Sequence, residues 1–297
     1  MDDRFTIADF RKRFPDDAAC LEEIRQIRFR DFTCPKCGRE NELSRVKGRT
    51  SYACNCGYQV YPLAGTVFEK STTSLWLWFY AMYLMVQTRA GISAKQLERE
   101  LGVTYKTAWR IAKQIRTLMS AEDGEMLSGE VEVDETFVGG ADQNRHPDKK
   151  HSNRGGHQDK AVVFGMVSRG GKAKLVHVPH TGTEALTPPI VLNVAPDATI
   201  YHDEHGVYSK LHKVGFTHDG IKHQRKQYVS GSVHTQNIEN IWSHLKRGIT
   251  GVYRHVSPKY LQLYANEYGW RYSHRTLQGG MFDALVSQVS LPVAKRG

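Results

Sequence analysis

The sequence predicts an α/β protein, with a mixed sheet flanked by helices that follows a cysteine-containing segment and a group of helices. Three observations support this prediction. The hydrophobic pattern changes from the helical period to period 2 after Gly124. Strand and helix patterns then alternate over residues 130–273, as in α/β folds. Four of the five cysteines lie between residues 34 and 56, which sets this segment apart from the rest of the chain.

The expected elements follow in chain order. Residues 1–30 have a helical pattern, the cysteine-containing segment covers 31–68, and residues 73–120 are expected to hold three helices. The expected strands are 130–138, 161–168, 172–178 and 198–202. The later helices are expected at 184–193, 206–213, 235–247 and 258–273, and no helix is expected after 273. We therefore divide the chain into three domains, 1–70, 71–124 and 125–297.

Size and charge limit the classes of function. The 297 residues suffice for two or three domains, and 41 Lys and Arg against 31 acids give a net charge of +10. A basic surface attracts nucleic-acid phosphates, although many soluble proteins are basic without binding nucleic acid. The N-terminus lacks the apolar stretch of a secretion signal, and the apolar run 75–86 is shorter than the roughly 20 residues that span a bilayer. We expect a cytoplasmic protein with reduced thiols and no membrane partner.

The segment 139–160 between the first two expected strands is rich in glycine and basic residues and has no hydrophobic period. Such a composition indicates a surface loop. It is either a solvated linker or an arm that contacts DNA, and the sequence favours neither.

The cysteines form two short motifs. Cys34 and Cys37 make a CxxCG motif, and Cys54 and Cys56 make a CxCG motif that requires a tighter turn. Four thiolates from two such turns match the tetrahedral structural Zn²⁺ site of a zinc ribbon, which we expect within residues 31–68. Such a small unit would take much of its folding free energy from the metal. The alternative is four incidental thiols. Cys20, in the preceding helix, is interpreted as a core residue.

Residues 91–115 match a helix-turn-helix. Ser93 and Thr104 are candidate caps for its two helices, and Gly102 opens the turn between them. Many helical bundles have the same spacing without binding DNA. Together with the net charge, however, the pattern favours DNA binding through the outward residues of the second helix. These residues are Tyr105, Lys106, Thr107 and Arg110.

Three acidic residues stand out in the second half. Asp134 lies within an expected strand, Asp203 follows another, and Glu239 lies on the expected helix 235–247. A carboxylate among strand valines is costly to bury unless it is paired or ligated. Two acids from strands and one from a helix can converge as in RNase H-like folds, where they hold two Mg²⁺ or Mn²⁺ ions for attack on phosphorus.

Residues near these acids complete the hypothesis. Lys246 lies two helical turns after Glu239 and shares its face, where it can hold a phosphate with the help of Arg247. The neighbouring acids are interpreted as solvated and not catalytic; they are Glu132, Glu135 and Glu204.

Long blocks of the sequence resemble bacterial insertion-sequence transposases of the IS1595 group, also called ISXO2-like. The blocks include YPLAGTVFEKS at 61–71, VEVDETFVGG from 131, YHDEHGVYSKL from 201 and HTQNIENIWSHLKRG from 234. The resemblance implies that Asp134, Asp203 and Glu239 are catalytic metal ligands and that Lys246 assists them. Some members carry Asn for the third acid, and Asn237 is the nearby polar alternative.

The resemblance also implies a reaction and partners. An activated water would cleave DNA at terminal inverted repeats, and the freed 3′-hydroxyl would attack target DNA. Joining two ends implies a homodimer or higher oligomer in the bacterial cytoplasm, associated with the nucleoid. Two alternatives remain: an RNase H-like endonuclease that does not join strands, and a DNA-binding regulator built on the zinc ribbon and helix-turn-helix.

Overall fold

The structure is a computed structural model that describes residues 5–120, 124–140, 160–203, 206–221, 235–277 and 279–290. It divides into two compact units, Met1–Ala121 with Thr276–Gly297, and Glu122–Arg275. The predicted basic loop 139–160 falls outside the described residues except for positions 139, 140 and 160.

The first unit begins with helices α1 (Ile7–Arg13) and α2 (Asp17–Arg28), followed by a small three-stranded sheet and by the apolar helix α3 (Leu75–Gln87). The α3 helix is short of a membrane span, and none of the helices in the described ranges is long and apolar enough to cross a bilayer. Its apolar residues instead form the core of this unit, where Phe79 packs on Phe14 with ring centroids 5.0 Å apart.

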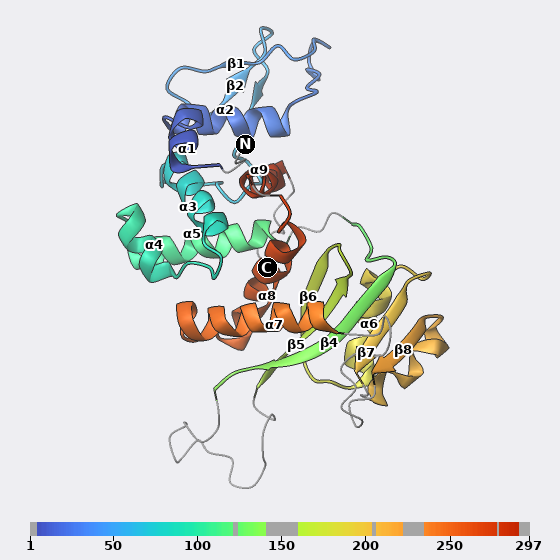
Figure 1. Ribbon diagram of the computed structural model, residues 1–297. Coiled ribbons are helices and arrows are strands. Elements are labelled where there is room, and N and C mark those ends of the chain that lie inside the picture. Colours follow the sequence, from blue (N-terminus) through green and yellow to red (C-terminus); the bar gives the residue numbers. More distant parts are fainter. Residues whose placement is uncertain are drawn as a thin grey trace. The chain divides into compact units, whose positions relative to one another are not determined.

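The first unit also takes in the end of the chain, which was predicted to belong to the third domain, 125–297. Helix α9 (Met281–Ser287), which was not predicted, lies beside the N-terminal helices (Figure 1). Its Phe282 is buried and contacts Phe10 and Phe14, with ring centroids 5.9 and 5.7 Å away. A helix of seven residues has too few turns to show a clear period, so its packing partners decide its place.

The predicted helix-turn-helix forms as α4 (Ala94–Leu101) and α5 (Tyr105–Leu118). Both predicted caps are confirmed, because the Ser93 side chain accepts from the Gln96 N–H and the Thr104 side chain from the Thr107 N–H. Gly102 ends α4 at φ 63° in the left-handed region, where only glycine is unstrained. These local signals explain why the sequence sufficed to predict this motif.

The second unit is built on a five-stranded sheet with the order β6-β5-β4-β7-β8. The β4, β5 and β6 strands are antiparallel, whereas β7 and β8 run parallel to β4, as in the predicted RNase H-like core. The β8 strand was missed because THDGI lacks alternating apolar residues. The strands are β4 (Glu130–Val138), β5 (Ala161–Ser168), β6 (Ala173–Val178), β7 (Thr199–Asp203) and β8 (Thr217–Ile221).

Helices cover both faces of this sheet (Figure 1). One face carries α6 (Thr183–Asn193) and the 3-10 helix η3 (Gly206–Val214), which bury Val131 and Val133 of β4. The other carries α7 (Gln236–Gly248) and α8 (Pro258–Ser273), joined by the π-helical turn η5 (Ile249–Tyr253). Because strand side chains alternate, the even-numbered β4 residues Glu132 and Asp134 face α7.

Candidate active site and candidate zinc site

The sheet brings two of the three predicted acids together. The β4 and β7 strands pair in parallel, with Glu130 opposite Thr199 and Glu132 opposite Tyr201. The same register, continued by two residues, places Asp203 beside Asp134 on the face that α7 covers. The proximity also has an electrostatic effect, because the Asp203 charge contributes to raising the pKa of Asp134.

Asp134 lies in a largely desolvated position. Burial, together with the charges of Glu135 and Asp203, raises its pKa to about 7, although a hydrogen bond from Trp242 acts in the opposite direction. That bond runs from the indole N–H of Trp242 on α7 to Asp134 Oδ2 over 2.8 Å. A raised carboxyl pKa beside a second carboxylate is the arrangement in which a bound cation is favoured.

Glu239 lies on α7, three residues before Trp242, but its side chain is exposed and accepts a hydrogen bond from the Thr235 hydroxyl at 3.4 Å. Lys246 and Arg247 are also exposed on α7, and Arg247 Nε donates to the Ser243 carbonyl. The structure thus places Glu239 on the helix that contacts Asp134 through Trp242. It does not gather the three carboxylates within ligand distance of one another.

Glu132, which the sequence analysis interpreted as a solvated acid, is fully buried. Its Oε2 accepts from the backbone N–H groups of Asn237 and Ile238 at 2.9 and 3.2 Å. These N–H groups belong to the first turn of α7, which lacks intrahelical acceptors, so Glu132 caps the helix from the neighbouring strand. The period-2 pattern, which places Glu132 on the same face as Asp134, was the signal that could have revealed it.

The other oxygen of Glu132 is also satisfied. Its Oε1 accepts from Arg169 Nε at 3.0 Å and from Asn237 Nδ2 at 2.8 Å. The side chain of Asn237, considered above as an alternative third acid position, is therefore engaged in anchoring α7 to β4. The other two neighbouring acids differ: Glu135 is half-buried on the opposite face and accepts from the Tyr208 hydroxyl, and Glu204 lies outside the described residues.

Glu132→Gln is expected to destabilise the protein by about 3 kcal/mol, because an amide cannot accept from all four donors and leaves buried N–H groups unsatisfied. The matched control is Glu130→Gln, which alters a partly exposed partner of Arg169 and is expected to change stability by less than about 1 kcal/mol. Urea unfolding of both variants measures the difference. Equal midpoints would show that Glu132 does not anchor α7.

The predicted DNA-contacting residues of α5 differ in exposure. Tyr105 and Lys106 are exposed, whereas Thr107 is partly buried and its hydroxyl lies 3.0 Å from that of Thr104. The guanidinium of Arg110 lies over the Trp78 ring, 5.9 Å from its centroid. Tyr105 and Lys106 thus present the most accessible groups of the predicted set.

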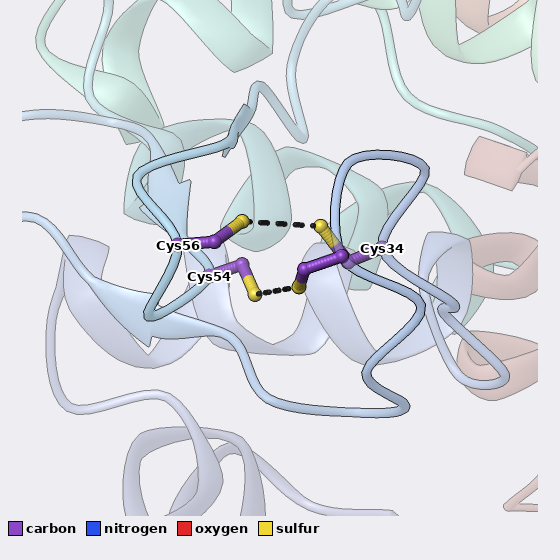
Figure 2. Close-up of side chains that lie close together, drawn as sticks. Cys34, Cys54 and Cys56 are labelled. Carbon is purple, nitrogen blue, oxygen red and sulfur yellow. Dashed lines mark hydrogen bonds between the residues drawn. The ribbon is translucent and has the colours of Figure 1, made fainter.

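The four predicted zinc ligands come together in the first unit. Their donor atoms all lie within 4.8 Å of one another, and they are the one such group of three or more candidate ligands in the described ranges. Cys34 Sγ lies 3.5 Å from Cys56 Sγ (Figure 2), and Cys37 Sγ lies 3.6 Å from Cys54 Sγ. A tetrahedral Zn²⁺ with Zn–S bonds of about 2.3 Å requires sulfur atoms about 3.8 Å apart. The cluster therefore fits a zinc ion.

The short CxC motif reaches the cluster through a tighter turn. The Gly57 N–H donates to the Cys54 carbonyl three residues before it, whereas the Gly38 N–H donates to the Cys34 carbonyl four residues before it. Both glycines have positive φ, 85° and 73°, in a region that disfavours residues with a side chain. The second turn is one residue shorter, and it still places the thiols of Cys54 and Cys56 in the cluster. Cys20 is buried in α2, as predicted.

Three short strands lie in the same segment as the four cysteines. The strands β1 (Ser44–Arg45), β2 (Tyr52–Ala53) and β3 (Gln59–Val60) form an antiparallel sheet. Tyr52 is buried and its hydroxyl donates to Glu22 of α2 at 2.8 Å. Each strand has only two residues, so this sheet buries little apolar surface by itself.

Comparisons with known proteins connect this chain with transposable elements. Residues 126–273 match the family described as "ISXO2-like transposase domain". An "Uncharacterized protein in transposable element ISH50" from Halobacterium salinarum is 29% identical over 253 residues, which cover 80% of this chain and 85% of that protein. A solved structure, "Crystal structure of a pre-cleavage Mos1 transpososome", aligns over 72% of this chain and 79% of that chain at 11% identity. Its TM-score of 0.26 is too low to support a shared fold.

Proposed function

We propose, on the premise that residues 126–273 form an ISXO2-like transposase domain, that this protein cleaves DNA at terminal inverted repeats and joins the freed 3′-hydroxyl ends to target DNA. The family match and the relative from a transposable element support a transposase. The reaction steps, the DNA substrates and the residues that carry them are our proposal.

The observation that carries the proposal is the pair Asp134 and Asp203 on adjacent parallel strands of the matched domain. Their carboxylates repel each other, and Asp134 is largely buried, so the pair favours a bound divalent cation. Mg²⁺ or Mn²⁺, two ions in our proposal, would supply activation of the attacking oxygen and stabilisation of the leaving oxygen. Glu239 is proposed as the third ligand because it lies on α7, the helix that contacts Asp134 through Trp242.

The basic residues of α7 are proposed to hold the substrate. Lys246 and Arg247 are exposed on the same helix as Glu239, and Lys246 follows it by two turns. In this position the Lys246 ammonium can pair with a phosphate of the strand that is cut, and Arg247 can pair with a neighbouring phosphate.

DNA recognition is assigned to the first unit. Tyr105, Lys106, Thr107 and Arg110 are proposed to meet DNA through α5, as the second helix of a helix-turn-helix does. The zinc ribbon adds exposed cations, since Arg39, Arg45, Lys47 and Arg49 are all solvent-facing. Two ends must be held for joining, so we propose at least a homodimer on DNA, with the protein associated with the bacterial nucleoid.

The test uses a labelled duplex from the inverted repeats that flank the coding sequence, a supercoiled target plasmid and Mg²⁺ or Mn²⁺. The expected result is metal-dependent cleavage of the duplex and its joining to the plasmid. Asp134→Asn should bind the duplex but form neither product. The matched control is Asp197→Asn, an exposed carboxylate in the turn before β7, which should act like the unmodified protein.

The products distinguish the three functions, and the two variants test the site. Cleavage without joining would support an endonuclease in place of a transposase. Binding without cleavage in either metal would support a DNA-binding regulator. Equal activity of Asp134→Asn and Asp197→Asn would show that the aspartate pair is not the catalytic site.

A further inference from the structure

We propose that Trp242 is a positioning residue, whose indole N–H holds the Asp134 carboxylate in the orientation in which it receives a divalent cation. The inference rests on the proposed function, because it takes Asp134 to be a metal ligand. It adds a specific requirement for one N–H group on α7.

The first observation is the hydrogen bond itself. Trp242 Nε1 donates to Asp134 Oδ2 over 2.8 Å, and the Trp242 side chain is 5% exposed. The last torsion of an aspartate side chain is broad, so a carboxylate without such a partner samples many orientations. A donor at one oxygen fixes the plane of the group, and Oδ1 then has a defined direction. Carboxylate ligands of metals are generally oriented by hydrogen bonds of this kind.

The second observation is independent of the first and concerns Gly165. In the β4–β5 register Gly165 lies directly opposite Asp134. A Cβ atom at this position would lie 2.6 and 2.7 Å from two ring atoms of Trp242, and 2.4 Å from Cδ1 of Ile238. The ring of Trp242 therefore occupies the space that any side chain at position 165 would fill. Three segments, β4, β5 and α7, combine to place one indole against one carboxylate.

Trp242 also belongs to the apolar core between α7 and the sheet, so its packing and its hydrogen bond must be separated. Trp242→Phe keeps an aromatic ring in the core and removes only the donor together with part of the ring. The chain offers a matched control in Trp270, which is buried and whose indole N–H meets no acceptor among the described residues. Trp270→Phe removes a buried indole N–H that orients nothing.

The experiment measures Mn²⁺ affinity of the full chain, by the electron paramagnetic resonance of free Mn²⁺, alongside cleavage and duplex binding. Trp242→Phe is expected to weaken Mn²⁺ binding and to slow cleavage about tenfold, without changing the affinity for the terminal-repeat duplex. Trp270→Phe should change none of the three. Equal Mn²⁺ affinities for the two variants would overturn the inference.

Gly165→Ala provides a second approach that retains the indole. The added methyl group displaces the ring from Asp134, so Mn²⁺ affinity is expected to fall, and combination with Trp242→Phe should add little further loss because both changes break one interaction. Full additivity would contradict the inference.

Asp134→Asn separates the inference from the proposed function on which it rests. If that variant binds Mn²⁺ as well as the unmodified protein, the proposed metal site fails. If it loses Mn²⁺ while Trp242→Phe does not, only the positioning role fails.

Discussion

Replacing Cys54 by serine is expected to abolish zinc binding by the four-cysteine cluster and to unfold the segment 31–68. The three strands around the cluster have two residues each and cannot stabilise the segment alone. Zinc binding in small zinc-dependent peptides contributes about 10–16 kcal/mol, and that contribution is free energy of folding. Loss of one of four thiolates removes most of it.

The measurements for this prediction are the zinc content of the purified protein and the rate of proteolysis within 31–68. The unmodified protein should carry one zinc ion per chain, and the Cys54→Ser variant none, with rapid cleavage in the segment. Cys20→Ala is the control, because Cys20 is a buried thiol outside the cluster. A zinc-free but protease-resistant unmodified protein would contradict the prediction.

Asp134→Asn is expected to lower strand cleavage by at least on the order of a thousandfold and yet to stabilise the metal-free protein above pH 7. The sign follows from the pKa of Asp134, which burial raises from 3.8 to about 7. The unfolded state then ionises at lower pH than the folded state. The folded protein loses stability as the pH rises from about 4 to 7, and asparagine avoids this loss.

Thermal unfolding without divalent metal tests this second prediction at pH 5 and pH 8. The melting temperature of Asp134→Asn relative to the unmodified protein should rise between the two pH values. Mg²⁺ should stabilise the unmodified protein more at pH 8 than at pH 5 and should have little effect on the variant. Asp197→Asn should follow the unmodified protein throughout. A variant that is less stable at pH 8 than at pH 5, relative to the unmodified protein, would show that Asp134 is not a destabilising buried carboxylate.

Local signals account for what could be predicted correctly. The caps Ser93 and Thr104 and the left-handed Gly102 act within one helical turn, so the helix-turn-helix could be recognised without knowledge of the fold. The alternation of Val131 and Val133 likewise depends on one strand only. Elements without such signals were missed, namely β8, which lacks apolar alternation, and α9, which depends on Phe282 packing among distant aromatic residues.

From the sequence it could be predicted that Asp134 lies on a strand and that Asp203 directly follows one. It could also be predicted that Glu239 and Lys246 share a helix face and that two cysteine motifs can provide four thiolates. These properties depend on residue type and spacing. Only the tertiary structure shows that Glu132 anchors α7 to the sheet and that Asp134 accepts a hydrogen bond from Trp242. Glu132 can be buried because its hydrogen-bond donors come from Arg169, in the turn after β5, and from the first turn of α7. Asp134 contacts Trp242 because Gly165 lets α7 approach. Such contacts join residues more than 30 positions apart, and no local pattern records them.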